Sequence, residues 1–103
     1  MRENIKEKLS QIKNRYLNDG IEIIGIFGSV AKNKDDLLSD IDIAYKLNKD
    51  IFFKNYKDGF SQLIKLEDIK NELEKEFKQR VDFINLTSNE ELKQSIKKDL
   101  IYV

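Results

Sequence analysis

The spacing of hydrophobic residues predicts two amphipathic helices in this chain. Near its start, four such residues recur at steps of four, three and four, as on one face of a helix over residues 3–18. These residues are Ile5, Leu9, Ile12 and Tyr16. The sequence Asn18-Asp19-Gly20 signals the end of that helix and a turn. A second stripe predicts a long helix over residues 60–78 and consists of Leu63, Leu66, Ile69, Leu73 and Phe77.

Most other segments are typical of strands joined by polar connections. Three strands are predicted, over residues 21–27, 40–46 and 81–86. Local signals add a helix over residues 29–34, a final helix over 89–99 capped by Thr87 or Ser88, and a closing strand over 101–103. Residues 48–59 show no clear periodicity, and Gly59 is expected to end them. The order α-β-α-β-α-β-α predicts an α+β fold, with helices packed on a small mixed β-sheet, as one domain over residues 1–103.

The composition excludes several kinds of chemistry. The chain has no histidine and no cysteine, so it lacks an imidazole base, a thiol nucleophile and a thiolate zinc site. Any metal ion must be held by oxygen ligands, which favours magnesium, manganese or calcium. Basic and acidic residues each total 19, and the zero net charge argues against direct nucleic-acid binding. The sequence contains neither a signal-peptide core nor an apolar run that could span a membrane, so we expect a cytoplasmic protein.

Asp40 and Asp42 are the first candidates for metal ligands. They lie two residues apart on a predicted strand, so their side chains share one face, while Ile41 and Ile43 point into the core. Two neighbouring carboxylates raise each other's pKa and destabilise the fold unless a cation neutralises them. A bound divalent cation is one interpretation of the pair, and a solvent-exposed polar strand face is the other.

Three further features could complete a site. Gly28-Ser29 begins a predicted helix, where free backbone N–H groups can bind a phosphate, although an ordinary turn capped by serine explains the same residues. Lys32 follows closely and could meet a phosphate or stay solvated. Asp82 lies on the third predicted strand and is a third carboxylate if that strand lies beside the aspartate pair; otherwise it is a surface residue. Three carboxylates and phosphate oxygens can hold two magnesium ions for nucleotidyl transfer. Aromatic residues that could stack on a base, or belong to the core, are Tyr16, Tyr45, Phe52, Phe53 and Tyr56.

Two segments together resemble the signature of the minimal nucleotidyltransferases, which are small members of the DNA polymerase beta-like nucleotidyltransferase superfamily. They are Gly28-Ser29-Val30-Ala31-Lys32-Asn33 and Ser39-Asp40-Ile41-Asp42-Ile43. The family pattern is G-S-x-A-R-G, five spacer residues, then S-D-x-D-[LIV], and the spacing here matches without a gap. Asp82, about forty residues after the pair, matches the family's third carboxylate, so the resemblance covers nearly the whole chain. Lys32 replaces the family's arginine and Asn33 its glycine; lysine keeps the charge but lacks the planar fork that binds phosphate in a bidentate manner.

The resemblance implies a magnesium-dependent nucleotidyltransferase that uses ATP. The residues it implies to be catalytic, and to hold two Mg²⁺ ions, are Asp40, Asp42 and Asp82. The residues it implies to bind the nucleotide are Gly28, Ser29 and Lys32. Similar proteins are commonly antitoxins that transfer AMP from ATP to a tyrosine of a HEPN-family ribonuclease toxin, which is therefore the implied partner.

Two alternatives stay open. The chain could be a non-catalytic antitoxin or binding module that neutralises its partner by direct contact. It could also be a nucleotidyltransferase for a small molecule, although such enzymes usually carry a further domain that forms the acceptor pocket.

Overall fold

The computed structural model describes residues 2–27, 40–87 and 89–103. The N-terminal part contains helix α1 (Arg2–Ile12), a 3₁₀ helix η1 (Lys13–Asp19) and strand β1 (Ile21–Phe27). The middle part contains strand β2 (Ile41–Leu47) and helices α2 (Lys49–Asn55) and α3 (Gly59–Phe77). The C-terminal part contains strand β3 (Val81–Asn85), helix α4 (Glu90–Ile96), a 3₁₀ helix η2 (Lys97–Asp99) and strand β4 (Ile101–Tyr102).

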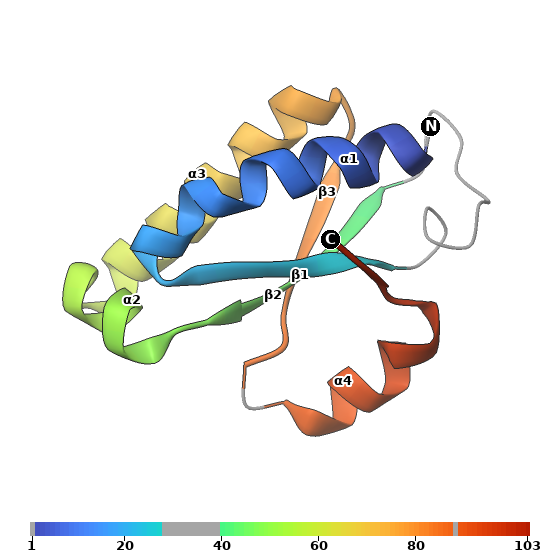
Figure 1. The fold of residues 1–103 in the computed structure, drawn as a ribbon. Helices are drawn as coiled ribbons and strands as arrows, with labels where there is room; N and C mark the ends of the chain where they lie inside the picture. Colours follow the sequence, from blue (N-terminus) through green and yellow to red (C-terminus); the bar gives the residue numbers. More distant parts are fainter. Residues whose placement is uncertain (1, 28–39, 88) are drawn as a thin grey trace.

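The strands form one mixed sheet in the order β3-β2-β1-β4. Strand β1 is antiparallel to β2 and to β4, whereas β2 and β3 are parallel. Helices α1 and α3 cover one face of this sheet, and α4 lies on the other side (Figure 1). This arrangement confirms the predicted α+β fold with a small mixed sheet. In the part of the chain described, no helix is long and apolar enough to cross a membrane.

The core lies between the sheet and the two long helices. Its fully buried side chains include Leu9 of α1, Ile43 of β2, and Ile69 and Leu73 of α3. The predicted helical stripes therefore face the sheet, except at the start of the second one, where Leu63 is 68% exposed and only the residues from Leu66 onward pack against the core. The first stripe continues into η1, where Tyr16 is buried and donates a hydrogen bond of 2.8 Å to a carboxylate oxygen of Glu72.

The turn predicted at Asn18-Asp19-Gly20 is confirmed. Gly20 ends η1 with a positive φ of 85°, a conformation that glycine adopts without steric cost. A Cβ atom at this position would lie 2.5 Å from the backbone nitrogen of Phe52. Gly20 therefore allows α2 to pack closely against the turn.

Several local predictions are wrong at the element boundaries. Gly59 begins α3 instead of ending the preceding segment, because the Asp58 carboxylate accepts a hydrogen bond of 2.7 Å from the Ser61 N–H and caps the helix. Asn89 caps α4, whereas the Thr87 hydroxyl accepts a hydrogen bond from the Leu47 N–H. Residues 48–59, which showed no clear pattern, contain α2. The helix predicted over residues 29–34 and the alternative cap Ser88 lie outside the described residues.

Candidate functional site

Parallel pairing of β2 and β3 places Asp42 directly beside Asp82. Side chains alternate between the two faces of a strand, so both carboxylates lie on the face opposite to buried Ile41 and Ile43. Asp40 precedes β2 by one residue and is partly buried, like Asp42, while Asp82 is exposed. The sequence suggested Asp82 as a third carboxylate if its strand lay beside the strand with the aspartate pair. Strand β3 does lie beside β2.

Contacts away from the carboxylates hold this register. On the helix-covered face, the rings of Tyr45 and Phe83 stack with centroids 4.1 Å apart and join β2 to β3. At the start of β3, the Val81 N–H donates a hydrogen bond of 2.9 Å to the side chain of Glu74 on α3. A slip of one residue would turn Asp82 toward the helices, so these contacts determine on which face it lies.

The two carboxyl groups interact strongly. Partial burial, the neighbouring charge of Asp82, a hydrogen bond between the two side chains and the charge of Asp40, in that order of importance, raise the pKa of Asp42 from 3.8 to about 6. Near neutral pH the ionised pair is therefore unfavourable without a cation. The sheet thus concentrates negative charge at one point of this face.

The donor set at this point fits a magnesium ion. All three candidate ligands are carboxylates, and Mg²⁺ is usually held by one or two carboxylates together with substrate phosphates. Within residues 2–27, 40–87 and 89–103, no group of three carboxylates lies close enough to bind a metal by itself. The Asp42–Asp82 pair, with Asp40 nearby, therefore fits a metal that also binds a phosphate better than a closed structural metal site.

The predicted phosphate-binding residues Gly28, Ser29 and Lys32 lie outside the described residues. In sequence, Gly28 directly follows Phe27, which pairs with Asp42 across β1 and β2. The described residues that flank this segment in the sequence are Phe27 and Asp40.

Most aromatic residues considered for base stacking belong to the core. Tyr16, Tyr45 and Phe52 are at most 4% exposed. Tyr56 is half-buried and donates a hydrogen bond of 2.9 Å to Asp19. Tyr102 on β4 is 57% exposed. It pairs with Gly25 of β1.

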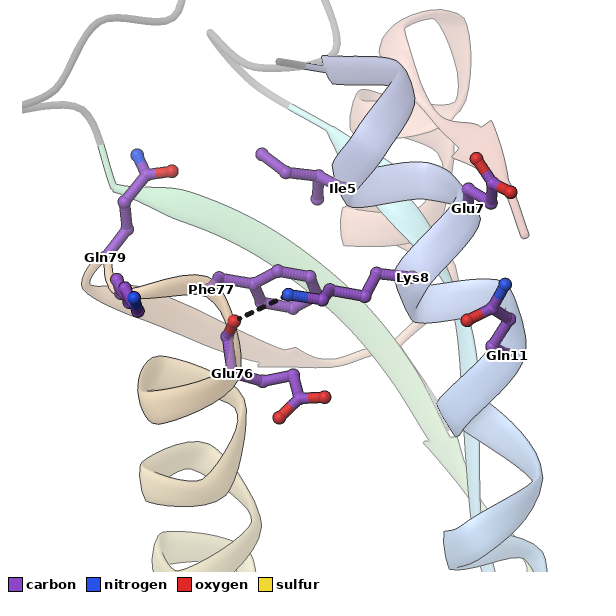
Figure 2. A pocket seen from close by; sticks show the side chains of 8 residues that line it. Ile5, Glu7, Lys8, Gln11, Glu76, Phe77 and Gln79 are labelled. Atoms are coloured by element: carbon purple, nitrogen blue, oxygen red, sulfur yellow. Dashed lines mark hydrogen bonds between the residues drawn. The ribbon is translucent and has the colours of Figure 1, made fainter.

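A cavity of about 430 Å³ lies elsewhere, between α1 and the C-terminal end of α3 (Figure 2). Ile5 and Phe77 contribute apolar surface, and the Lys8 ammonium donates a hydrogen bond of 3.1 Å to the Glu76 carbonyl oxygen across it. None of the three aspartates lines this cavity. The carboxylate pair therefore remains the candidate site.

Comparisons with known proteins cover the whole described chain. The family described as Polymerase beta, Nucleotidyltransferase matches residues 3–103. A protein of Methanocaldococcus jannaschii named "Putative protein adenylyltransferase MJ0126" is 32% identical over 105 residues, which cover 100% of this chain and 94% of that protein. No solved structure matches the chain significantly. Both matches span the strands that carry Asp42 and Asp82 and the segment between Phe27 and Asp40.

Proposed function

Because the chain belongs to the polymerase beta nucleotidyltransferase family, we propose that it transfers AMP from ATP to a hydroxyl group of a protein, with Mg²⁺ held by Asp40, Asp42 and Asp82. The observation that carries this proposal is the alignment of Asp42 with Asp82 on adjacent strands. That alignment supports a site for a metal bound to a nucleotide, because Mg²⁺ is usually held by one or two carboxylates together with phosphates.

The roles of the aspartates follow from their positions. Asp42 is partly buried and close to Asp40, so these two residues suit the nucleotide side of the site. Asp82 is exposed on β3, which lies at the edge of the sheet among the described strands, so an acceptor can approach it. Bound Mg²⁺ would neutralise the carboxylates and the phosphates and align the triphosphate.

The transfer itself is an in-line displacement. Asp82 accepts the proton of the acceptor hydroxyl, whose oxygen then forms a bond to the α-phosphorus of ATP. The bond from that phosphorus to the oxygen bridging the α- and β-phosphates breaks, and pyrophosphate leaves with the electron pair. Gly28, Ser29 and Lys32 would bind the phosphates during this step.

A protein acceptor is supported by the name of the relative from Methanocaldococcus jannaschii. We propose further that the acceptor is a tyrosine of a HEPN-family ribonuclease toxin and that the chain is its antitoxin, as the resemblance implies. Modification next to the active site of such a toxin would block it by steric and charge effects.

A second candidate function is neutralisation of the partner by direct contact. It is favoured by apolar residues exposed on the first turns of α3: Phe60, Leu63 and Ile64 are 75%, 68% and 46% exposed. Exposed apolar patches of this kind commonly mark protein-binding surfaces. Catalysis requires the aspartates, whereas neutralisation by contact does not. One experiment can therefore distinguish the two functions.

The experiment incubates the chain with Mg²⁺, the protein encoded beside it and ATP labelled at either the α- or the γ-phosphate. Adenylyl transfer predicts labelling of the partner from α-labelled ATP only. Asp42→Asn and Asp82→Asn should each abolish labelling, whereas Asp68→Asn, at an exposed position on α3, should not change it. A tight complex without label would refute catalysis and support neutralisation by contact.

A further inference from the structure

Strand β3 presents an open backbone edge at the residue that carries one of the carboxylates. Of the strands in the described part of the chain, only β2 lies beside β3. Their pairing begins with a hydrogen bond of 2.8 Å from the Ile41 N–H to the Arg80 carbonyl oxygen. Backbone groups alternate in direction along a strand, so Asp82 also directs its N–H and C=O groups toward β2, whereas Val81 and Phe83 direct theirs outward. The outer edge therefore offers hydrogen bonds to a further strand.

The first donor on this edge already has a partner. The Val81 N–H donates a hydrogen bond of 2.9 Å to the Glu74 carboxylate on α3, which confirms that the backbone groups of Val81 point outward. The next outward N–H and C=O groups along the edge are those of Phe83. An added strand would therefore form its backbone hydrogen bonds at Phe83, one residue beyond Asp82.

A groove of about 330 Å³ lies between α3 and this edge. Leu63 and Leu66 of α3 and Phe83 of β3 provide apolar surface in it. Leu63 is largely exposed, and exposed apolar surface of this kind commonly marks a binding site. Asp82 also lines the cavity, so the groove reaches the edge position that carries the proposed catalytic carboxylate.

A strand added at the edge would use both faces of the sheet. Residues directly opposite one another on adjacent strands share a face, with Cβ atoms about 5 Å apart. A residue beside Phe83 therefore enters the groove on the helix-covered side, whereas a residue beside Asp82 lies on the carboxylate face. These two residues are neighbours in the sequence of the added strand, whatever its direction.

We propose that β3 and this groove bind the acceptor protein through an extended segment, whose hydroxyl residue lies beside Asp82 and whose adjacent apolar residue fills the groove. The inference rests on the proposed function, since it takes Asp82 as the group that accepts the hydroxyl proton. In such strand addition, backbone hydrogen bonds supply affinity and pockets for alternate side chains supply specificity. A hydroxyl residue adds no charge beside Asp82, whereas a second copy of β3 would bring another Asp82 near it, and like charges on adjacent strands are destabilising.

Amide hydrogen exchange tests the edge directly, with the chain and the protein encoded beside it. In the complex formed with Mg²⁺ and a non-hydrolysable ATP analogue, the Phe83 amide should exchange about tenfold or more slowly than in the free chain, because it gains a hydrogen bond. The amides of α1, which lies away from this edge, should exchange at unchanged rates and serve as the internal control.

The kinetics of AMP transfer test the groove. Leu63→Asp places a charge in the groove and should raise the KM for the partner protein at least about tenfold, with kcat and the KM for ATP unchanged. Leu17→Asp makes the same change at an exposed leucine of η1 and should leave both KM values unchanged. Mass spectrometry of the modified partner should find an apolar residue next to the residue that carries AMP.

Each other outcome overturns the docking site. If AMP is transferred but Leu63→Asp leaves the KM for the partner unchanged, or the Phe83 amide exchanges equally fast in the complex, the acceptor binds elsewhere and the proposed function stands. A modified residue with only polar neighbours would have the same meaning. Protection of the Phe83 amide that depends on the concentration of the chain alone would assign the edge to a second copy. A wild type that transfers no AMP would refute the proposed function, and the docking of an acceptor with it.

Discussion

The Asp42–Asp82 pair predicts that replacing one carboxylate stabilises the metal-free protein. In the Asp42→Asn variant the amide keeps the shape of the side chain and can donate a hydrogen bond to Asp82, but it removes the charge that the fold disfavours. The folded state binds the Asp42 proton more tightly than the unfolded state, because its pKa rises from 3.8 to about 6. Ionisation therefore costs stability, and this cost grows as the pH rises from about 4 to 6 and then levels off.

The magnitude follows from that shift. A change of about two pKa units corresponds to about 3 kcal/mol. Asp42 is only partly buried, so screening by solvent reduces this to roughly 1–2 kcal/mol. For a chain of this size, such a gain raises the midpoint of thermal unfolding by about 5–10 °C.

Urea and thermal unfolding, followed by circular dichroism in the presence of a chelator, measure this effect between pH 3.5 and 8. Asp42→Asn should exceed the wild type in stability at pH 7.5 and match it near pH 3.5, whereas Asp68→Asn should follow the wild type throughout. Adding Mg²⁺ with ATP should stabilise the wild type and reduce the difference. An Asp42→Asn variant that is no more stable than the wild type at pH 7.5 would refute the reasoning.

Three further substitutions test the packing of the fold. Gly25→Ala should destabilise the fold by about 1–3 kcal/mol and expose the β4 amides to hydrogen exchange, because the added Cβ would meet the Ile101 carbonyl oxygen. Gly59→Ala is the control, because open space surrounds Gly59. Equal effects of the two substitutions on stability would contradict the packing described. Tyr16→Phe should lose about 1 kcal/mol in urea unfolding, since it removes the hydrogen bond to a carboxylate of α3; an unchanged midpoint would show that the bond adds nothing. Phe60→Ser should leave stability within about 0.5 kcal/mol because this side chain is 75% exposed, and a larger loss would place it in the core.

The sequence predicted the elements with strong periodicity and missed what depends on tertiary contacts. Both long helices and the three main strands were predicted because their hydrophobic residues follow the helix or strand period. Helix α2 was missed because Phe52 is its only buried residue, so no stripe marks it. The 3₁₀ geometry of η1 was also missed. The spacing between Ile12 and Tyr16 is compatible with burial of Tyr16 in an α-helix or in a 3₁₀ helix, so it does not distinguish the two.

The candidate site could be predicted in part for similar reasons. The spacing of Asp40 and Asp42 predicts a shared strand face, but the alignment with Asp82 depends on parallel pairing between distant strands. The raised pKa of Asp42 depends on the same pairing.

The central claim, that Asp42 and Asp82 form the metal–nucleotide site, is tested most directly by nuclear magnetic resonance with Mn²⁺ and a non-hydrolysable ATP analogue. The paramagnetic ion should broaden the backbone amide signals around Asp42 on β2 and Asp82 on β3 at substoichiometric concentration, and leave those of α2 sharp. Asp42→Asn should abolish this broadening while the rest of the spectrum stays that of the folded protein. Broadening centred on another acidic segment, or unchanged in the Asp42→Asn variant, would contradict the assignment of the site.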